Sequence, residues 1–229
     1  MFPQFKTIAD HALLVTFSDE VSDEAHELVM ALDAAIAADP APGVIETVPA
    51  IVNLLVAFDP IATDHAAIES HLRGCMKAAQ SKTTAGTRRV VQVCYEEALS
   101  PDLEAVASAT NLSPDALINA HLAGSFRVLM YGFAPGYAYL SGVPLQIQVP
   151  RKPAPVRDVP AGSVIIAGSQ CLVTTLTMPT GWSIIGRSPT AILTGDPEQP
   201  FLFDVGDPVT FERIDATTFD QLSKGRVDG

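Results

Sequence analysis

The sequence predicts an α+β protein with a helix-containing N-terminal part and a β-rich C-terminal part. Apolar residues recur at helical spacing over residues 20–38 and 63–80. From Phe126 onward, short β-rich runs alternate with Pro and Gly, and prolines are dense at 144–160. At roughly 100–200 residues per domain, the 229 residues allow one large domain or two modest ones.

The N-terminal part contains two helices between short strands. In chain order, the predicted elements are a strand at 5–17, a helix at 20–38 ended by Pro40 and Gly43, strands at 44–47 and 51–58, a helix at 63–80 with Thr63 as its N-cap, and a strand at 88–95. This order is the ferredoxin-like split βαβ pattern. The polar stretch 81–89 is a candidate linker, in which case the strand at 88–95 opens the second domain instead. We expect a ferredoxin-like domain at 1–86 and a β-rich domain at 87–229.

Two short helices and a series of short strands make up the second part. Ser100-Pro101 and Ser113-Pro114 each place a capping hydroxyl before a proline at the first helical position. The predicted strands are Phe126–Phe133, Ser163–Ala167, Leu172–Leu176, Ser183–Ile185 and Val209–Ile214. Short strands separated by turn residues predict a compact sandwich or barrel. The polar segment from Asp220 predicts a loose tail.

The composition excludes several classes of partner. A formal net charge of −12 repels a phosphate backbone and an anionic membrane surface, so we expect neither nucleic acid nor membrane as a partner. Three cysteines without a CxxC pair indicate a reducing cytoplasm. The N-terminus lacks the apolar core of a signal peptide, and the longest apolar runs are far shorter than the roughly 18 residues of a membrane span.

Common catalytic motifs are absent from the sequence. It contains no GxxxxGK[ST], GxGxxG, HExxH or GxSxG motif, and no Cys/His cluster suited to zinc. We therefore expect no Walker-type ATP site, no metal site and no α/β-hydrolase nucleophile in this chain.

Three long motifs are rich in aromatic, Gly and Pro residues. They are YGFAPGYAYL at 131–140, VPAGSVIIAGSQ at 159–170 and GWSIIGRSP at 181–189. Together with Pro150-Arg151 and Arg157, they resemble the GF-x-PGF-x-YL, PR…PR-x-VPAGSV-x-IAG-x-Q and GGW-x-x-IGR motifs of the allophanate hydrolase subunit 1 family, also described as the family of the 5-oxoprolinase B subunit. Cys94-Tyr95, Pro101-Asp102-Leu103 and His121 match in the same order, so the resemblance spans roughly residues 5–215.

The resemblance implies a fold and a partner. The family is described as a ferredoxin-like domain followed by a cyclophilin-like β-barrel. Its members pair with a second protein, which resembles allophanate hydrolase subunit 2 or the 5-oxoprolinase C subunit.

The resemblance also implies three alternative functions. In one branch the pair works with a third protein to open 5-oxoproline, a small molecule, to glutamate using ATP, and we expect that ATP to be bound with or by the partner subunits. In another branch, related domains form a biotin-dependent carboxyltransferase acting on urea. A further member is a sporulation-kinase inhibitor, which makes a non-enzymatic regulator of a histidine kinase the third alternative.

His121 and Gln170 are the candidate catalytic residues. An imidazole with an ordinary pKa near 6.5 suits proton transfer, and the match to the family favours this role for His121. The alternative is a histidine that packs between helix and barrel. The Gln170 amide matches both the donor and the acceptor of an amide or lactam group, and the alternative is a turn side chain bonded to backbone.

Eight further residues are candidates for substrate binding. Arg151, Arg157 and Arg187 lie where strands meet loops, and a guanidinium suits a carboxylate. The alternative is ion pairing with a nearby aspartate. In the loop Pro135-Gly136-Tyr137, the glycine allows close backbone approach. The loop therefore predicts an oxyanion-type nest or, alternatively, turn geometry and aromatic core. The remaining candidates are Phe133, Pro135, Gly136, Tyr137 and Gly168.

Overall fold

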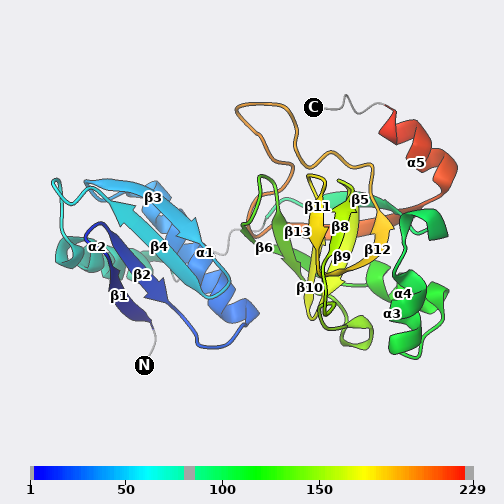
Figure 1. Ribbon diagram of the computed structural model, residues 1–229. Helices are drawn as coiled ribbons and strands as arrows, with labels where there is room; N and C mark the ends of the chain where they lie inside the picture. Colours follow the sequence, from blue (N-terminus) through cyan, green and yellow to red (C-terminus); the bar gives the residue numbers. More distant parts are fainter. Residues whose placement is uncertain (1–2, 80–85, 225–229) are drawn as a thin grey trace. The chain divides into compact units, whose positions relative to one another are not determined.

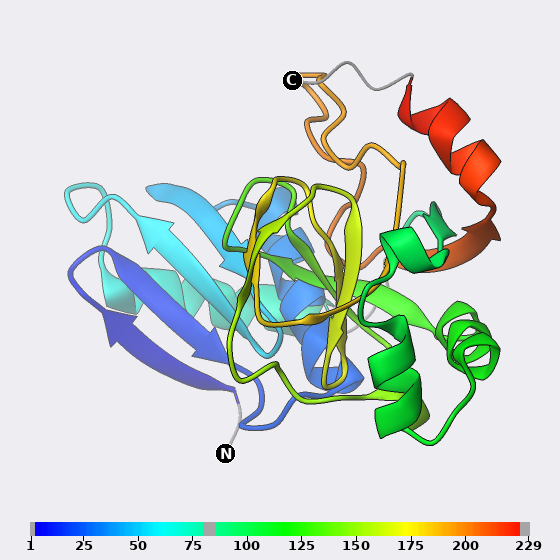
Figure 2. The same ribbon diagram turned by 45° about the vertical axis from the view of Figure 1, so that its right-hand side comes forward.

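The computed structural model describes residues 3–79 and 86–224 (Figures 1 and 2). The chain divides into two compact units, Met1–Ala85 and Gly86–Gly229. Each unit has its own sheet and its own hydrophobic core, as an independent domain requires.

The first unit is a four-stranded antiparallel sheet with two helices packed on one face (Figure 1). Its elements are β1 (Gln4–Ile8), β2 (Ala12–Thr16), α1 (Asp23–Ala38), β3 (Val44–Pro49), β4 (Asn53–Phe58) and α2 (His65–Ala79). The strand order is β1-β2-β4-β3. Burial alternates along β4, so every second side chain faces the helices. Leu54, Val56 and Phe58 are fully buried in the core between the sheet and the two helices, which therefore form two layers.

The order of elements in this unit differs from the prediction. The strand expected at 5–17 is a hairpin, because residues 9–11 form a turn in which Ala9 has a left-handed φ of 51°. The strand expected at 88–95 lies in the second unit, as the alternative assignment proposed, and β1 takes an edge of the sheet. The unit is therefore ββαββα instead of βαββαβ. Helix α2 is capped by Asp64, whose carboxylate accepts from the Ala67 N–H at 2.8 Å, and not by Thr63.

The second unit is a closed seven-stranded barrel, so the barrel alternative is confirmed (Figure 1). Its strands are β5 (Arg89–Cys94), β6 (Phe126–Tyr131), β7 (Ala138–Ser141), β9 (Ser163–Ala167), β10 (Gln170–Val173), β12 (Ser183–Arg187) and β13 (Pro208–Ile214). They follow the order β10-β7-β6-β13-β5-β12-β9, and β13 pairs with β5 in parallel. A separate antiparallel pair consists of β8 (Val156–Val159) and β11 (Met178–Thr180).

Short helices pack against the barrel, and two of them lie together beside it in both views (Figures 1 and 2). The helices are η1 (Glu97–Leu99), α3 (Leu103–Ala109), α4 (Pro114–Leu122), η2 (Leu145–Ile147) and α5 (Ala216–Ser223). Helix α3 packs against β12 and α4 against β13. Leu103 and Leu117 from these two helices belong to the barrel core, so the helices and the barrel form one unit.

One of the two predicted helix caps is confirmed and the other is wrong. Ser113 caps α4, since its Oγ accepts from the Ala116 N–H at 3.2 Å. The Ser100 hydroxyl instead donates to the carbonyls of Tyr95 and Glu96, both at 2.9 Å, and α3 begins after Asp102 without a side-chain cap. Residues 220–223, the described start of the expected loose tail, belong instead to the helix α5 (Ala216–Ser223).

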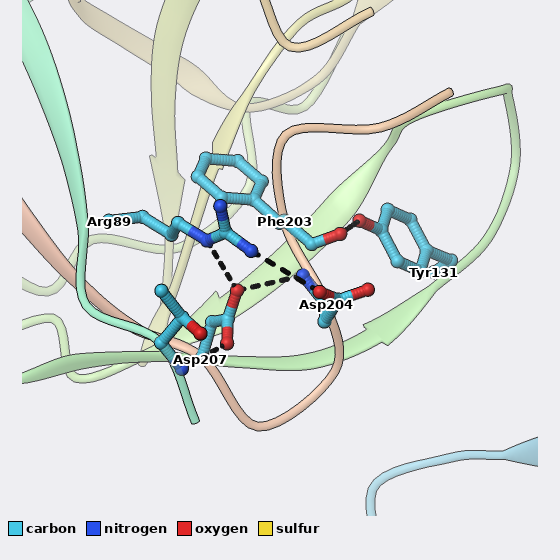
Figure 3. A network of polar contacts seen from close by, with 6 residues as sticks. Arg89, Tyr131, Phe203, Asp204 and Asp207 are labelled. Carbon is cyan, nitrogen blue, oxygen red and sulfur yellow. Dashed lines mark hydrogen bonds and ion pairs between the residues drawn. The ribbon is translucent and has the colours of Figure 1, made fainter. Parts of the chain in front are cut away.

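Asp207 fixes the start of β13 beside the start of β5 (Figure 3). Its buried carboxylate accepts from Arg89 Nε at 2.7 Å, from the Thr87 N–H at 2.7 Å and from the Asp204 N–H at 2.9 Å. Another nitrogen of the same guanidinium reaches the exposed Asp204 carboxylate at 3.2 Å. Charge-assisted bonds of this kind are stronger than neutral ones, so they fix the register of the parallel strand pair.

Candidate functional site

The barrel wall has two buried faces, one inside the barrel and one outside. On β9, Val164 and Ile166 belong to the barrel core, whereas Ile165 and Ala167 belong to a second apolar cluster. Because side chains alternate between the faces of a strand, this second cluster lies outside the wall. The buried members of the outer cluster are Tyr137, Val159, Ile165, Ala167, Leu172, Trp182 and Ile184.

Strand register places Gln170 on the outer side of the wall. Strand β10 pairs with β9 through Gln170↔Ala167 and Leu172↔Ile165. Ala167, Leu172 and Ile165 all belong to the outer cluster, so Gln170 lies on the same side. Cys171 lies between and points into the barrel core, where it is fully buried. Gln170 is partly exposed, so its amide lies at the accessible edge of the cluster.

Aromatic rings and one guanidinium extend the outer cluster. The rings of Tyr139 and Trp182 form an edge-on contact with their centroids 5.9 Å apart. The Arg151 guanidinium lies 5.5 Å from the Trp182 ring centroid, within the range of a cation–π contact. We call the surface formed by Tyr137, Tyr139, Arg151, Gln170 and Trp182 the outer aromatic face.

The loop between β6 and β7, residues 132–137, carries four of the predicted binding residues and is tightly anchored. The Thr175 hydroxyl donates to the Pro135 carbonyl at 2.7 Å. Gly136 has a φ of 70°, and a Cβ there would lie 2.8 Å from Leu193 Cδ2. The left-handed backbone conformation therefore favours glycine, and a Cβ would in addition require the exposed Leu193 side chain to shift.

The tip of this loop exposes an aromatic side chain in a strained conformation. Phe133 has a φ of 74° and is 75% exposed, and its ring lies 5.6 Å from that of the buried Tyr137. Burial, with a smaller contribution from Tyr139, raises the pKa of Tyr137 to about 12, so its hydroxyl stays protonated. The Tyr137 N–H donates to the Ala134 carbonyl and the Gly132 N–H to the Tyr137 carbonyl, so neither donor is open to an oxyanion.

Polar groups of the outer aromatic face lack hydrogen-bond partners among residues 3–79 and 86–224. This holds for the Gln170 amide, the Arg151 guanidinium and the indole N–H of Trp182, and equally for the hydroxyls of Tyr137 and Tyr139. None of these groups is a buried polar atom without a partner, so each reaches solvent and is accessible to a small ligand with both donors and acceptors.

Gly168 and Arg157 lie near the outer aromatic face. Gly168 forms the β9–β10 turn with a φ of 55° and is two residues from Gln170. Arg157 is exposed on β8, two residues before Val159 of the outer cluster. Within the part of the chain that the structure describes, neither Arg157 nor Arg151 forms an ion pair, so the alternative of aspartate pairing is wrong for both.

Arg187 lies apart from this group. It pairs with Ser163 at one end of β9, whereas Gln170 pairs with Ala167 at the other end. Four residues at roughly 3.3 Å each separate the two ends by about 13 Å. The structure therefore does not bring Arg187 together with Gln170.

His121 lies inside the barrel core and is 0% exposed. Its Nδ1 is 2.8 Å from the Tyr95 hydroxyl and its Nε2 is 3.7 Å from Cys171 Sγ, and the rings of Phe126 and Phe211 pack beside it. Burial lowers the pKa of His121 to about 3, so the imidazole is neutral at physiological pH. This environment matches the alternative interpretation of His121 as a packed histidine.

A cavity of about 260 Å³ lies in another part of the second unit, between η1, α3, α4 and β13. It contains none of the catalytic or substrate-binding candidates predicted from the sequence, although Tyr95, Pro101 and Leu103 belong to the stretches that match the family. Its lining includes Tyr95, Glu97, Leu103, Glu104, Ile118 and Arg213. These residues are spread over more than 100 positions of the chain, so no single local motif predicts the cavity.

Comparison with known proteins establishes the family. Residues 3–203 match the family model described as "Carboxyltransferase domain, subdomain C and D". The chain belongs to this family. It is 35% identical over 227 residues, 92% of each chain, to the 5-oxoprolinase B subunit of Bacillus subtilis (strain 168). It is 33% identical over 173 residues, 74% of this chain and 78% of the relative, to the protein of the same name in Escherichia coli O157:H7. The family predicted from the motifs is confirmed.

Solved structures share the fold of this carboxyltransferase-domain chain. The crystal structure of TTHA0988 has a TM-score of 0.79 at 31% identity. That match covers 90% of this chain and 40% of TTHA0988, so the chain spans less than half of that protein. The urea amidolyase of K. lactis has a TM-score of 0.75 at 14% identity over 96% of this chain and 15% of that one, which is a likeness of fold alone.

Two further findings concern the described residues only. None of the helices in residues 3–79 and 86–224 has the length and apolarity needed to cross a membrane. Within the same ranges, His, Cys, Asp and Glu side chains form no group of three or more that is arranged to hold a metal ion.

Proposed function

We propose that this carboxyltransferase-domain chain is the B subunit of an ATP-dependent 5-oxoprolinase, which opens 5-oxoproline to glutamate. The observation that carries the proposal is the 35% identity, over 92% of both chains, to the 5-oxoprolinase B subunit of Bacillus subtilis. Its partner is then a protein of the 5-oxoprolinase C subunit type, acting with a third protein. The chain alone is inactive or weakly active. Its three free, buried cysteines are compatible with a reducing cytoplasm.

The outer aromatic face is the proposed substrate-binding surface. 5-Oxoproline presents a lactam N–H, a lactam carbonyl and a carboxylate. The Gln170 amide can donate to the carbonyl and accept from the N–H. The Arg151 guanidinium can bind the carboxylate through two parallel hydrogen bonds. The ring of Trp182 offers an apolar surface for the methylene groups.

ATP supplies the driving force for opening a stable lactam, and we propose that it binds with or by the partner subunits. The sequence of this chain contains no GxxxxGK[ST] motif. The role left to this chain is to bind and orient the lactam, with Arg157 near the face as a second cation. His121 is enclosed in the barrel core, so its imidazole cannot touch a substrate on the outer aromatic face. Its role is then that of a positioning residue, which acts through the barrel core.

The test is ATP-dependent formation of glutamate from 5-oxoproline by this chain and the two proteins encoded beside it, with each omitted in turn. We expect glutamate only when all three are present. Arg151→Ala should lower kcat/KM by roughly 10- to 150-fold, the equivalent of a charge-assisted hydrogen bond. Gln170→Ala should lower it by roughly 5-fold, whereas Gln146→Ala, which truncates an exposed glutamine on η2, should leave it unchanged. Folded proteins that form no glutamate in any combination would refute the proposal.

A biotin-dependent carboxyltransferase is the second candidate function. The description of the matching family as a carboxyltransferase domain favours it. The same guanidinium that suits the carboxylate of 5-oxoproline would suit that of carboxybiotin. Inhibition of the assembled activity by avidin would support this candidate, and an unchanged rate would count against it.

A further inference from the structure

We propose that Asp102 and Lys152 are positioning residues for Arg151, the proposed carboxylate-binding group of the outer aromatic face. Arg151 lies in the irregular segment 148–155 between η2 and β8, so no helix or strand of its own fixes its side chain. Its guanidinium nevertheless lies 5.5 Å from the centroid of the Trp182 ring. The consequence for substrate binding rests on the proposed 5-oxoprolinase function, whereas the geometric effect on Arg151 does not.

Asp102 uses its side chain for distant partners instead of for the helix that it precedes. It is the residue before α3, where an aspartate commonly accepts from an N–H of the first helical turn, but it forms no such cap. Its Oδ2 accepts instead from the Ile184 N–H at 2.7 Å and from Lys152 Nζ at 2.5 Å. Its own N–H donates to the Ile184 carbonyl at 3.1 Å. Asp102 therefore binds both backbone polar groups of a β12 residue whose side chain belongs to the outer cluster.

Lys152 attaches the irregular segment to both sides of Trp182. Its N–H donates at 2.7 Å to the carbonyl of Gly181, the residue directly before the tryptophan. Its ammonium group reaches Asp102, which is bonded to Ile184, two residues after the tryptophan. Because Arg151 directly precedes Lys152, these two attachments fix the backbone from which the guanidinium extends to the indole ring.

The ion pair between Asp102 and Lys152 is shielded from solvent. The side chains of Lys152 and Asp102 are 20% and 21% exposed. A second ion pair of the same unit joins Arg213 and Asp115, whose side chains are 49% and 78% exposed. Partly buried charge pairs are screened much less than exposed ones. The first pair therefore holds its geometry more firmly, and the second provides a matched control.

NMR on the full chain tests the geometry without any reaction. The ring current of Trp182 should shift the side-chain signals of Arg151 away from their random-coil values. Asp102→Asn should remove most of that shift, and so should Lys152→Met, which tests the same ion pair if the first variant does not fold. Asp115→Asn should leave the shift intact. A full shift in both variants of the buried pair, or an equal loss in the control, would overturn the proposal.

Kinetics of the assembled enzyme test the consequence for substrate binding. Asp102→Asn should lower kcat/KM for 5-oxoproline by roughly 3- to 10-fold, which is part of the roughly 10- to 150-fold loss expected for Arg151→Ala. The loss should appear in KM, because a carboxylate away from the lactam bond is bound alike in the ground state and the transition state. In the Arg151→Ala background the same change should have no further effect, since no guanidinium is left to position. Equal losses in both backgrounds would overturn the positioning role.

The two measurements separate this inference from the proposed function. If no combination of proteins formed glutamate but Asp102→Asn removed the shift of the Arg151 signals, the 5-oxoprolinase function would be refuted and the positioning of Arg151 supported. If glutamate formed with a kcat/KM that Asp102→Asn left unchanged, the positioning role would be refuted and the reaction would stand.

Discussion

Replacing Tyr95 with Phe measures what the buried hydrogen bond to His121 contributes to the barrel core. The change keeps the ring and removes the oxygen that lies 2.8 Å from His121 Nδ1, in a site with 0% exposure of the imidazole. A buried polar group left without a partner costs about 1–3 kcal/mol. We therefore expect the free energy of unfolding of the second unit to fall by about that amount. At about 2–4 °C per kcal/mol, Tm should fall by roughly 2–12 °C.

The assay is urea unfolding followed by the fluorescence of Trp182, the single tryptophan, which lies in the second unit and therefore reports on that unit. Tyr139→Phe is the matched control, because the Tyr139 hydroxyl has no hydrogen-bond partner among the described residues. Tyr139→Phe should change the free energy of unfolding by no more than about 0.5 kcal/mol. If Tyr95→Phe destabilised the unit no more than Tyr139→Phe did, the bond to His121 would contribute nothing net to stability, and the reasoning from its burial would be refuted.

The remaining predictions concern the same unit and use the same tryptophan signal. The folded-state pKa of His121, about 3, lies below its unfolded value near 6.5, so stability is complete above pH 6.5 and should fall by up to roughly 1.4 kcal/mol per pH unit below it. His121→Gln should remove that slope, and an unchanged slope would contradict the assignment. Gly136→Ala should destabilise by about 2–5 kcal/mol because it adds overpacking to a left-handed φ, and Gly168→Ala by only about 1–2 kcal/mol because its surroundings are open. Equal losses would show that packing at Gly136 is unimportant. Asp207→Ala should cost about 3–5 kcal/mol since it removes the buried carboxylate that accepts from a mostly buried guanidinium and from two backbone N–H groups, whereas Asp204→Ala, at the exposed end of the network, should cost under about 1 kcal/mol. Similar costs for the two would refute the dominance of the buried carboxylate.

Local patterns predicted the elements whose signals lie within a few residues. The two long helices of the first unit follow from apolar spacing, and Ser113 caps α4 as its place before Pro114 predicts. Predictions failed where one local sequence pattern is compatible with two different structures. Ser100 also precedes a proline, but its hydroxyl bonds to carbonyls behind it. The segment 5–17 is apolar enough for one strand, but Ala9 turns the chain into a hairpin.

The candidate site was only partly predictable, because the outer aromatic face depends on the pairing of distant strands. The motifs singled out Gln170 and the loop at 132–137, but not which of them share a face. Pairing of Gln170 with Ala167 decides this, since a shift of one residue would send the glutamine into the barrel core and Cys171 to the outside. The same register points the Cys171 side chain into the barrel, where its Sγ lies next to His121 Nε2. A residue type that suits proton transfer therefore ends in the core, while the amide beside it in the barrel wall stays accessible.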